Sequence, residues 1–409
     1  MKRVALIGNV NNNFFAITRH LRDMGYDAHL FYRIALDHFR PQADTYEEDY
    51  TTFCTAVTWL DKGLFGIDED QITKDLRGFD FYIGQGDEAA AAYRAGFIMD
   101  VYFPYGSDVY KYAYLRQEFS FAHRLLYYYR LRNIAQVNKT MRKGTTSKSM
   151  RGAIANARNI LVEYTNDDFE EKIKGLKCKG QYRNVPMPFI YDKEYRSVAE
   201  LKTADAPWQN QVEELRANNR LLILYHGRQE WKTKYNEFTP KNTHHLIIGF
   251  ANFVKKNPDA KCALVMLEYG HDLDNSKHLV NELGIEKSVA WLPKMYRREI
   301  MYLIGKMDVC SGQFGRSYLT FGTIVESMLM AKPVIHYRDD KLYEKFHSNL
   351  YPLLNARDPE EIEQQISYAY DNPEELKRIG DEACKWIKQN FIEQPLKELT
   401  SLIEQTTTR

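Results

Sequence analysis

The stretch that decides the fold, Asp308–Tyr337, reads DVCSGQFGRSYLTFGTIVESMLMAKPVIHY. A short apolar run, Met307–Cys310, leads into a glycine-rich loop, and an apolar segment with helical spacing follows from Ile324 to Ala331. Pro333 cannot continue a helix, and Val334-Ile335 then has the composition of a buried strand. We therefore expect a loop, a helix and a strand, in that order.

The start of this helix is a candidate anion site. A helix that opens after glycines presents free backbone N–H groups and the positive end of its dipole. We expect an anionic ligand at Gly322 and Thr323. Glu326 lies in the first turn of the expected helix, where it is placed for a ligand hydroxyl and not for a phosphate.

Length and composition limit the classes of protein. The chain has 409 residues, which is typical of about two domains. Its 56 Lys and Arg residues against 55 Asp and Glu residues give a net charge of +1, so we expect no nucleic acid partner. The five cysteines are scattered and never form CxxC, which argues against disulfides and zinc and favours the reducing cytoplasm. No apolar run has the length of a signal peptide or a membrane span.

The first half of the chain opens like a parallel α/β sheet. Val4–Ile7 and Ala28–Tyr32 are apolar runs that flank a segment with helical periodicity, Phe14–Met24. The loop after the first run begins with Gly8-Asn9 and lacks GxGxxG. A nicotinamide-type dinucleotide fold is therefore only weakly indicated.

Two further strands are expected in this half, Phe79–Ile83 and Ile98–Phe103. They end in the turns Gly84–Asp87 and Tyr105–Asp108. Loops after the carboxyl ends of parallel strands line the ligand crevice, so both turns are candidate site material. The alternative, that they are ordinary polar turns, stays open.

Residues 122–159 contain nine Lys and Arg residues and no Asp or Glu. Apolar and aromatic residues cluster at the start of this basic stretch. Such a segment suits anionic lipid headgroups or a pyrophosphate-bearing acceptor, and makes the protein a candidate for peripheral attachment to a membrane. The same charge would attract nucleic acid, and a solvated helix face is the plain alternative.

The second half repeats the alternation of strands and helices, beginning with the strand Leu221–Tyr225. We expect a first domain at 1–190, a linker region at 191–215, a second domain at 216–385 and a helical tail at 386–409. Two cations, Arg228 and Lys241, follow the first strand of the second domain. Together with the helix of Glu326 they would neutralise a diphosphate and hold a ribose diol, which predicts a nucleotide-sugar site.

Several ordered motifs of the second half resemble the donor domain of GT-B glycosyltransferases, most closely the retaining family four. The segment HGRQEWK…PKNTHHLIIGFANF resembles the family's GR…KG…LI.AF, and NELGIEKSVAWLPKM resembles its following helix and strand. FGTIVESMLMAKPVIHY is similar to the family's FG…EAMA.G.PVI signature, and the closing helices also match. The resemblance implies two Rossmann-like α/β domains facing a cleft, with C-terminal helices that pack back toward the first domain.

The resemblance also implies roles for residues of the donor site. Arg228 and Lys241 would bind the diphosphate and stabilise the leaving group, with Lys232 as a rival for the second cation. Glu326 would hold the ribose hydroxyls. Backbone groups would also contact the phosphates or the sugar. They come from Gly227, Phe321, Gly322 and Thr323 of the second domain and from Gly8 and Asn9 of the first.

On the acceptor side, YGSD is similar to the family's GSD turn and points to Ser107 and Asp108. Asp108 would be a hydrogen-bond acceptor or base, and a structural helix cap is the alternative. The family's first glutamate, eight residues before Glu326, falls on Tyr318, so the grip on the sugar departs from the family pattern.

The implied reaction moves a sugar from a nucleotide-diphosphate sugar to a glycan, a glycolipid or a similar hydroxyl acceptor, with retention. Family members are thought to use the leaving phosphate as the proton acceptor, so we expect no cofactor and no metal. Two alternatives remain: a nucleotide-sugar 2-epimerase of the same architecture, and a non-catalytic nucleotide-sugar or glycan binder.

Overall fold

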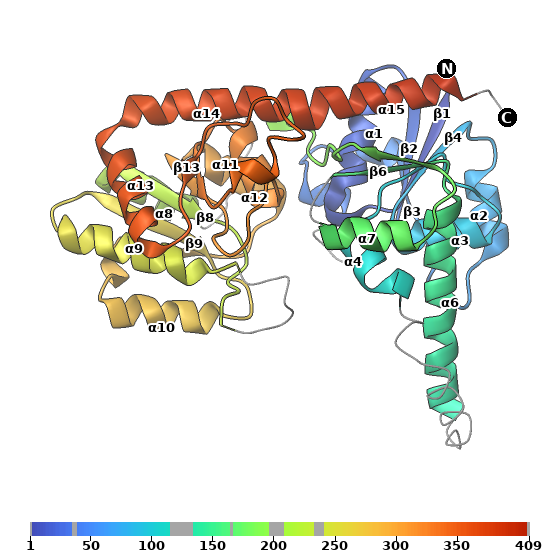
Figure 1. The fold of residues 1–409 in the computed structure, drawn as a ribbon, viewed down its shortest axis with the longest axis horizontal. Helices are drawn as coiled ribbons and strands as arrows, with labels where there is room; N and C mark the ends of the chain where they lie inside the picture. Colours follow the sequence, from blue (N-terminus) through green and yellow to red (C-terminus); the bar gives the residue numbers. More distant parts are fainter. Residues whose placement is uncertain are drawn as a thin grey trace. The chain divides into compact units, whose positions relative to one another are not determined.

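The chain folds into two compact units (Figure 1). Unit 1 consists of Met1–Tyr191 and Asn390–Arg409, and unit 2 consists of Asp192–Gln389. Each unit is described by itself below. The computed structural model describes residues 2–34, 39–114, 134–163, 167–195, 208–232 and 241–406.

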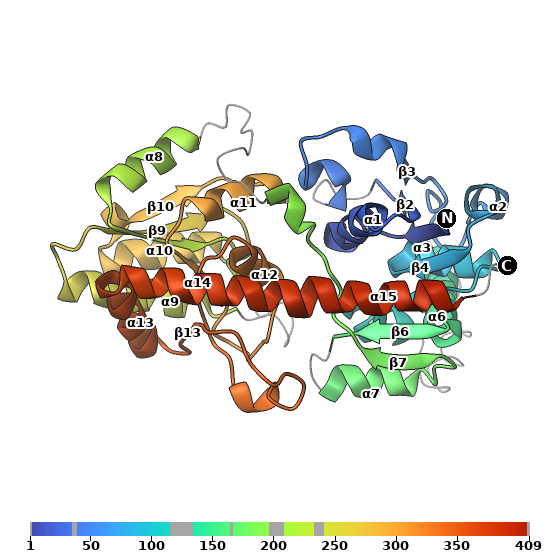
Figure 2. The same ribbon diagram turned by 90° about the horizontal axis from the view of Figure 1, so that it is seen from above.

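The described strands of unit 1 form a parallel sheet in the order β3-β2-β1-β4-β5-β6-β7. Figure 2 shows β6 and β7 side by side at one edge of this sheet. The bounds of the strands are β1 (Arg3–Ile7), β2 (Asp27–Tyr32), β3 (Cys54–Ala56), β4 (Phe81–Gly84), β5 (Val101–Tyr102), β6 (Asn159–Val162) and β7 (Gln181–Asn184). The helices are α1 (Asn13–Asp23), α2 (Glu69–Leu76), α3 (Gly86–Arg94), α4 (Gly106–Tyr110), α6 (Ile134–Asn156), α7 (Asp167–Gly175) and α15 (Gln394–Gln405).

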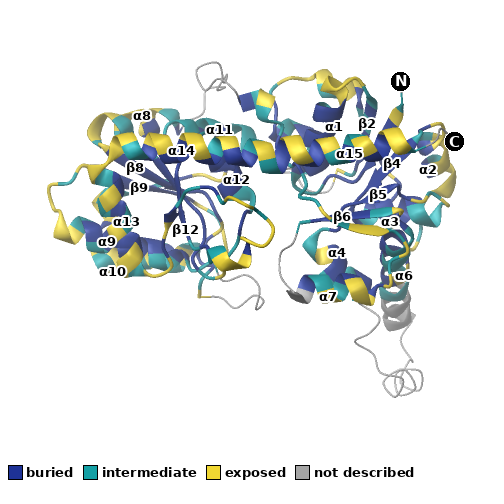
Figure 3. Cartoon of the chain, turned by 45° about the horizontal axis from the view of Figure 1, so that its top comes forward, coloured by how far each residue is buried: buried dark blue, intermediate teal, exposed yellow. Residues whose placement is uncertain are grey.

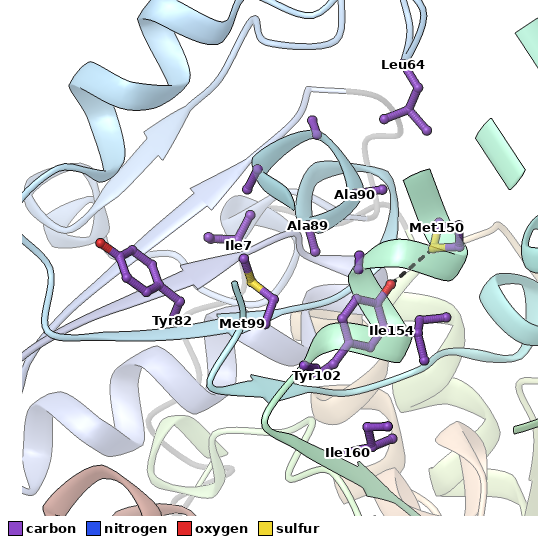
Figure 4. Packing of buried hydrophobic residues seen from close by; sticks show 14 of the residues in the cluster. Ile7, Leu64, Tyr82, Ala89, Ala90, Met99, Tyr102, Met150, Ile154 and Ile160 are labelled. Carbon is purple, nitrogen blue, oxygen red and sulfur yellow. Dashed lines mark hydrogen bonds between the residues drawn. The ribbon is translucent and has the colours of Figure 1, made fainter. Parts of the chain in front are cut away.

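Strand β1 lies at the centre of unit 1 because its apolar side chains are buried on both faces. Val4 and Leu6 belong to one hydrophobic cluster, and Ala5 and Ile7 to the other. This alternation follows from the two-residue period of a strand, and burial on both faces is typical of parallel sheets. Figure 4 shows the second cluster, in which the Tyr102 hydroxyl lies 3.2 Å from a methionine sulfur of α6.

The C-terminal helix α15 completes the first cluster of unit 1. Leu399, Leu402 and Ile403 pack with the apolar residues of β1 and α1. The Lys2 ammonium donates to the carbonyl of Ile403 at 2.6 Å, which ties the start of the chain to this helix. The end of the chain therefore packs back onto the first domain, as the sequence predicts.

The described strands of unit 2 form a second parallel sheet in the order β10-β9-β8-β11-β12-β13. Their bounds are β8 (Leu221–Tyr225), β9 (Cys262–Leu267), β10 (Val289–Leu292), β11 (Val309–Ser311), β12 (Val334–His336) and β13 (Leu354–Asn355). The helices are α8 (Gln209–Asn218), α9 (Thr243–Lys256), α10 (Leu273–Leu283), α11 (Arg297–Gly305), α12 (Gly322–Leu329), α13 (Pro359–Asp371) and α14 (Pro373–Lys388). The strands β8, β9, β11 and β12 are buried while the helices expose one side, as Figure 3 shows.

Both units have the Rossmann-like strand order, in which the chain starts in the middle of the sheet and winds first to one side and then to the other. The expectation of an α/β protein with two Rossmann-like domains is confirmed. The predicted linker region contains the start of α8, which unit 2 includes.

Part of the basic stretch 122–159 falls outside the described residues, namely 122–133, and the side chains up to 142 are also outside. In the described remainder, Met150 and Ile154 of α6 are buried in the core of unit 1. Arg158, which follows α6, forms an ion pair with the buried Asp100 at 2.7 Å. The described end of the basic stretch therefore packs in part against the core of unit 1. Within the described ranges, no helix is both long and apolar enough to cross a membrane.

Candidate functional site

The candidate donor site lies at the carboxyl ends of β8 and β11, which are neighbours in the sheet of unit 2. Successive crossovers leave β8 toward one side of the sheet and arrive at β11 on the other. A crevice outside such a switch point is where open α/β sheets bind ligands. His226, Gly227 and Arg228 follow β8, and the glycine-rich loop follows β11.

Arg228 and Lys241 come together at this point. The pKa of Lys241 is lowered to about 8, mainly by burial and also by the nearby charge of Arg228, while the charge of Glu230 opposes the shift. The Lys241 ammonium lies 5.2 Å from the centre of the Phe321 ring, so it faces the start of α12. Arg228 forms an ion pair with Glu230 at 3.2 Å. The side chains of Arg228 and Lys241 thus lie close to the start of α12, the helix that follows β11.

Lys232, the rival for the second cation, points elsewhere. Its ammonium donates to the side-chain oxygen of Asn275 in α10 at 3.2 Å. The geometry therefore favours Lys241 as the partner of Arg228.

Gly227 has a packing reason to be glycine. A Cβ at this position would lie 2.8 Å from the Tyr225 hydroxyl oxygen. That hydroxyl donates to the carbonyl of Arg228 at 2.9 Å and accepts from Thr243 at 2.9 Å. The absence of a side chain lets Tyr225 fix the turn that presents Arg228.

Glu326 is buried and held by two side chains. One carboxylate oxygen lies 3.0 Å from Nε2 of His226, and the other accepts from Nε of Arg297 at 2.9 Å. Burial alone would raise the pKa of Glu326, but the His226 hydrogen bond and the Arg297 charge outweigh it, so the pKa lies below its usual value. A carboxylate has about four lone-pair positions, so both oxygens can still accept from a ligand hydroxyl.

The structure corrects the position of Glu326 within its helix. Helix α12 begins at Gly322, two residues before the apolar periodicity that predicts it, so its first turn contains no acidic residue. Glu326 therefore lies one turn further in, and the helix start is free of negative charge. A Cβ at Gly322 would meet no protein atom within 4 Å, so the space beside this helix start is open.

The glycine-rich loop before α12 is fixed by hydrogen bonds that need no glutamate. Phe314 N–H donates to the carbonyl of Lys241 at 3.0 Å, and the Tyr343 hydroxyl donates to the carbonyl of Ser317 at 2.9 Å. Tyr318 occupies the position of the family's first glutamate, and its ring lies edge-on to Phe321 at 5.9 Å. The loop therefore presents an aromatic ring where the family pattern has a carboxylate.

Gly8 and Asn9 lie in unit 1 and shape the turn after β1. Gly8 has a φ of 99°, and a Cβ there would lie 2.4 Å from the carbonyl oxygen of Gln85. The Asn9 amide donates to Asn12 at 2.7 Å, and its oxygen accepts from Phe15 N–H at 3.0 Å. These contacts belong to the loop itself, and a donor role for both residues stays a prediction.

Asp108 is buried and accepts three hydrogen bonds in unit 1, from Tyr105 N–H at 3.2 Å, Gly86 N–H at 3.2 Å and the Tyr102 hydroxyl at 3.3 Å. Burial raises its pKa to about 7. The hydrogen bond from Tyr105 N–H caps the start of α4, which is the structural role given above as the alternative for Asp108. Ser107 is exposed. The acceptor role of both residues stays a prediction.

Two residues of the site were missed from the sequence. Arg297 and His226 contact Glu326 from α11 and from the end of β8, at separations of 29 and 100 residues along the chain. In the sequence, His226 could have been noticed only because it directly precedes the predicted pair Gly227-Arg228. In the described part of the chain, no group of three or more His, Cys, Asp and Glu residues is placed to hold a metal ion.

Comparison with known proteins supports the fold and the class. Residues 213–386 match the family model described as Glycosyl transferases group 1. No curated protein matches the chain at a significant level.

Solved structures match almost the whole chain at low identity. HepE from Anabaena in complex with UDP has a TM-score of 0.60 and 15% identity, covering 99% of this chain and 100% of that one. Sucrose-phosphate synthase from Thermosynechococcus elongatus has a TM-score of 0.59 and 13% identity, and the match covers 99% of each chain. UDP-GlcNAc 2-epimerase from Neisseria meningitidis bound to UDP-GlcNAc has a TM-score of 0.56 and 11% identity, and the match covers 99% of this chain and 100% of that one. At these identities the likeness shows the fold, which transferases and epimerases share.

The family match falls on the unit that brings Arg228, Lys241 and Glu326 to one edge of a Rossmann-like sheet. Residues 213–386 of unit 2 therefore match the Glycosyl transferases group 1 model, and the chain has the GT-B fold of two Rossmann-like domains.

Proposed function

We propose that this protein is a retaining glycosyltransferase that takes a nucleotide-diphosphate sugar as donor and a hydroxyl group of a glycan or glycolipid as acceptor. The observation that carries the proposal is the meeting of Arg228, Lys241 and the uncharged start of α12 at the switch point of unit 2. UDP is the first donor nucleotide to test, because HepE was crystallised with UDP and with UDP-glucose.

Each part of the site has a chemical task in this proposal. The guanidinium of Arg228 and the ammonium of Lys241 bind the diphosphate and stabilise the charge that develops as the glycosidic bond breaks. The first N–H groups of α12 add to this stabilisation. Glu326, fixed by Arg297 and His226, accepts hydrogen bonds from the ribose hydroxyls. The departing phosphate oxygen takes the acceptor's proton, so that the new bond forms on the same face, without a metal.

The test is incubation of the full chain with a panel of nucleotide sugars, with and without glycan and glycolipid acceptors. Nucleotide release that depends on an acceptor is the expected result, and the anomeric configuration of the product then tests retention. An isomerised donor would instead assign the epimerase activity, and binding without turnover would assign a non-catalytic binder. Activity unchanged by a chelator is expected if no metal takes part.

The pKa of Lys241 gives the donor affinity a pH dependence. Its pKa is lowered to about 8, so the ammonium loses its proton as the pH rises through this value, and its attraction for a diphosphate is lost. We expect UDP to bind about tenfold more weakly at pH 9.5 than at pH 7, by titration calorimetry. Lys241→Arg keeps its charge over this range and should flatten the profile. Equal slopes for both proteins would contradict the assignment of Lys241.

Gly322→Ala tests the open space beside α12. A methyl group there meets no protein atom within 4 Å, and alanine is the better helix former, so stability should be kept or slightly raised. A diphosphate at the helix start would meet the added methyl group, and we expect affinity for UDP and for pyrophosphate to fall about tenfold. Pyrophosphate affinity equal to that of the wild type would place the diphosphate elsewhere.

A further inference from the structure

A second cavity lies in unit 2 at the amino ends of the sheet strands. It has a volume of about 190 Å³, and its lining includes Leu221, the first residue of β8, together with Asp308 and Pro333, which directly precede β11 and β12. The candidate donor site lies at the carboxyl ends of the same strands. Because all of these strands are parallel, the two sites occupy opposite edges of the sheet.

The cavity is cationic. Arg220, Lys332 and Lys377 line it, and Asp308 is the one carboxylate in its lining. Asp308 already has partners, since one of its oxygens accepts from Arg216 at 2.7 Å and from Leu222 N–H at 2.7 Å. The lining cations therefore outnumber the carboxylate, and that carboxylate is neutralised by a cation outside the lining.

None of the three cations has an ion-pair partner among the described residues. Lys332 is half-buried at the turn between α12 and β12, and burial lowers its pKa, although the charge of Asp308 opposes this shift. An anion that approached the half-buried ammonium would offset the cost of its burial. The cavity lining thus holds more positive than negative charge.

Arg220 contacts an aromatic ring that also lines the cavity. Its guanidinium carbon lies 4.9 Å from the centre of the Tyr370 ring, so the ring supports one side of the group. Stacking of this kind leaves the N–H groups at the edge of the guanidinium plane for an anion with several oxygens. The first turn of α14 also lines the cavity but carries Glu374 and Glu375, so the side-chain cations and not the helix dipole are the basis of the site.

We propose that this cavity binds a phosphate group, as free inorganic phosphate or as part of a small phosphorylated molecule. Three cations suit a doubly charged anion with several acceptor oxygens better than a single carboxylate. The volume lies below the 300–1,000 Å³ typical of pockets for drug-sized ligands, so a whole nucleotide sugar does not fit. The site is thus separate from the donor site in place and in ligand.

Calorimetric titration of the full chain with inorganic phosphate tests the proposal. The Arg228→Ala background weakens phosphate binding at the donor site, where Lys241 and the start of α12 remain. In that background we expect one phosphate to bind, and Lys332→Gln or Lys377→Gln to weaken it about tenfold or more. Lys341→Gln, which removes a charge from another surface of unit 2, is the matched control and should leave the affinity unchanged. Lys377 is exposed, so its variant folds normally even if Lys332→Gln does not.

A parallel titration with glycerol 3-phosphate distinguishes the sources of the phosphate. Tighter binding than inorganic phosphate assigns a phosphorylated molecule, and weaker binding assigns the free ion. No phosphate binding in the Arg228→Ala background overturns the proposal. Equal weakening by Lys341→Gln and Lys377→Gln also overturns it, because the effect would then be one of overall charge. UDP binding to the wild-type chain is a separate measurement, so failure here leaves the proposed function standing.

Discussion

Replacing Arg228 with alanine is expected to lower kcat/KM for the donor about 100-fold, a loss typical of removing one hydrogen-bond donor to developing negative charge. The side chain is about half exposed, with 52% of its surface accessible, and it forms an ion pair with Glu230. The fold does not depend on it, but Glu230 is buried and would be left without its counter-ion. UDP and pyrophosphate should lose affinity together, because Arg228 is assigned to the diphosphate.

Two further variants separate charge from stability at this position. Arg228→Lys keeps the positive charge and loses the planar fork, so it should recover part of the activity. Arg228→Ala with Glu230→Gln removes the uncompensated carboxylate, so it should restore the unfolding midpoint without restoring the affinity for pyrophosphate. Full recovery of affinity in the double variant would show that Glu230 repels the ligand and that Arg228 makes no contact with it.

Replacing Glu326 with alanine is expected to be the most destabilising of these changes, by about 3–5 kcal/mol, because it removes the buried carboxylate that both Arg297 and His226 contact. Arg297 is 12% exposed and donates to Glu326, and His226 is also buried against it. Denaturant unfolding followed by tryptophan fluorescence measures the loss. The two partners of Glu326 are the reason to expect this loss.

The ribose role of Glu326 is tested with variants that keep the fold. Glu326→Gln retains the volume and one acceptor oxygen, so it should remain folded and bind UDP at least tenfold more weakly, while binding pyrophosphate, which has no ribose, as the wild type does. Glu326→Met with Arg297→Met replaces the ion pair by apolar groups of similar size and should recover much of the stability. Equal loss for UDP and pyrophosphate in Glu326→Gln would refute the ribose assignment.

Strands with a continuous apolar run were predictable from the sequence, and short or polar strands were not. Leu221–Tyr225 has the predicted bounds, since its apolar run lies between Arg220 and His226. Strand β7, Gln181–Asn184, is mostly exposed and polar, so no hydrophobic pattern announces it. Ile98 was predicted to open a strand but is exposed, and β5 spans only Val101–Tyr102.

The cations of the candidate site were predictable because Arg228 directly follows a buried strand. The sequence did not decide between Lys232 and Lys241, because the position of Lys241 relative to Arg228 depends on the tertiary structure and not on local sequence. The contact of Arg297 with Glu326 also depends on the packing of α11 beside α12, which local periodicity does not encode. Helix α12 begins before its apolar periodicity. Phe321 is its N-cap and Gly322 its first residue, and neither position has to contribute an apolar side chain to the core.

The placement of α15 in unit 1 has a consequence for biosynthesis. Unit 2 is one continuous segment, whereas unit 1 needs the last residues of the chain, including Leu399 and Ile403, to close its core. During translation, unit 2 can therefore finish folding while the nascent unit 1 still exposes the apolar surface that α15 will cover. The first domain to be synthesised is the last to be completed, and that exposed surface is where a chaperone would be needed.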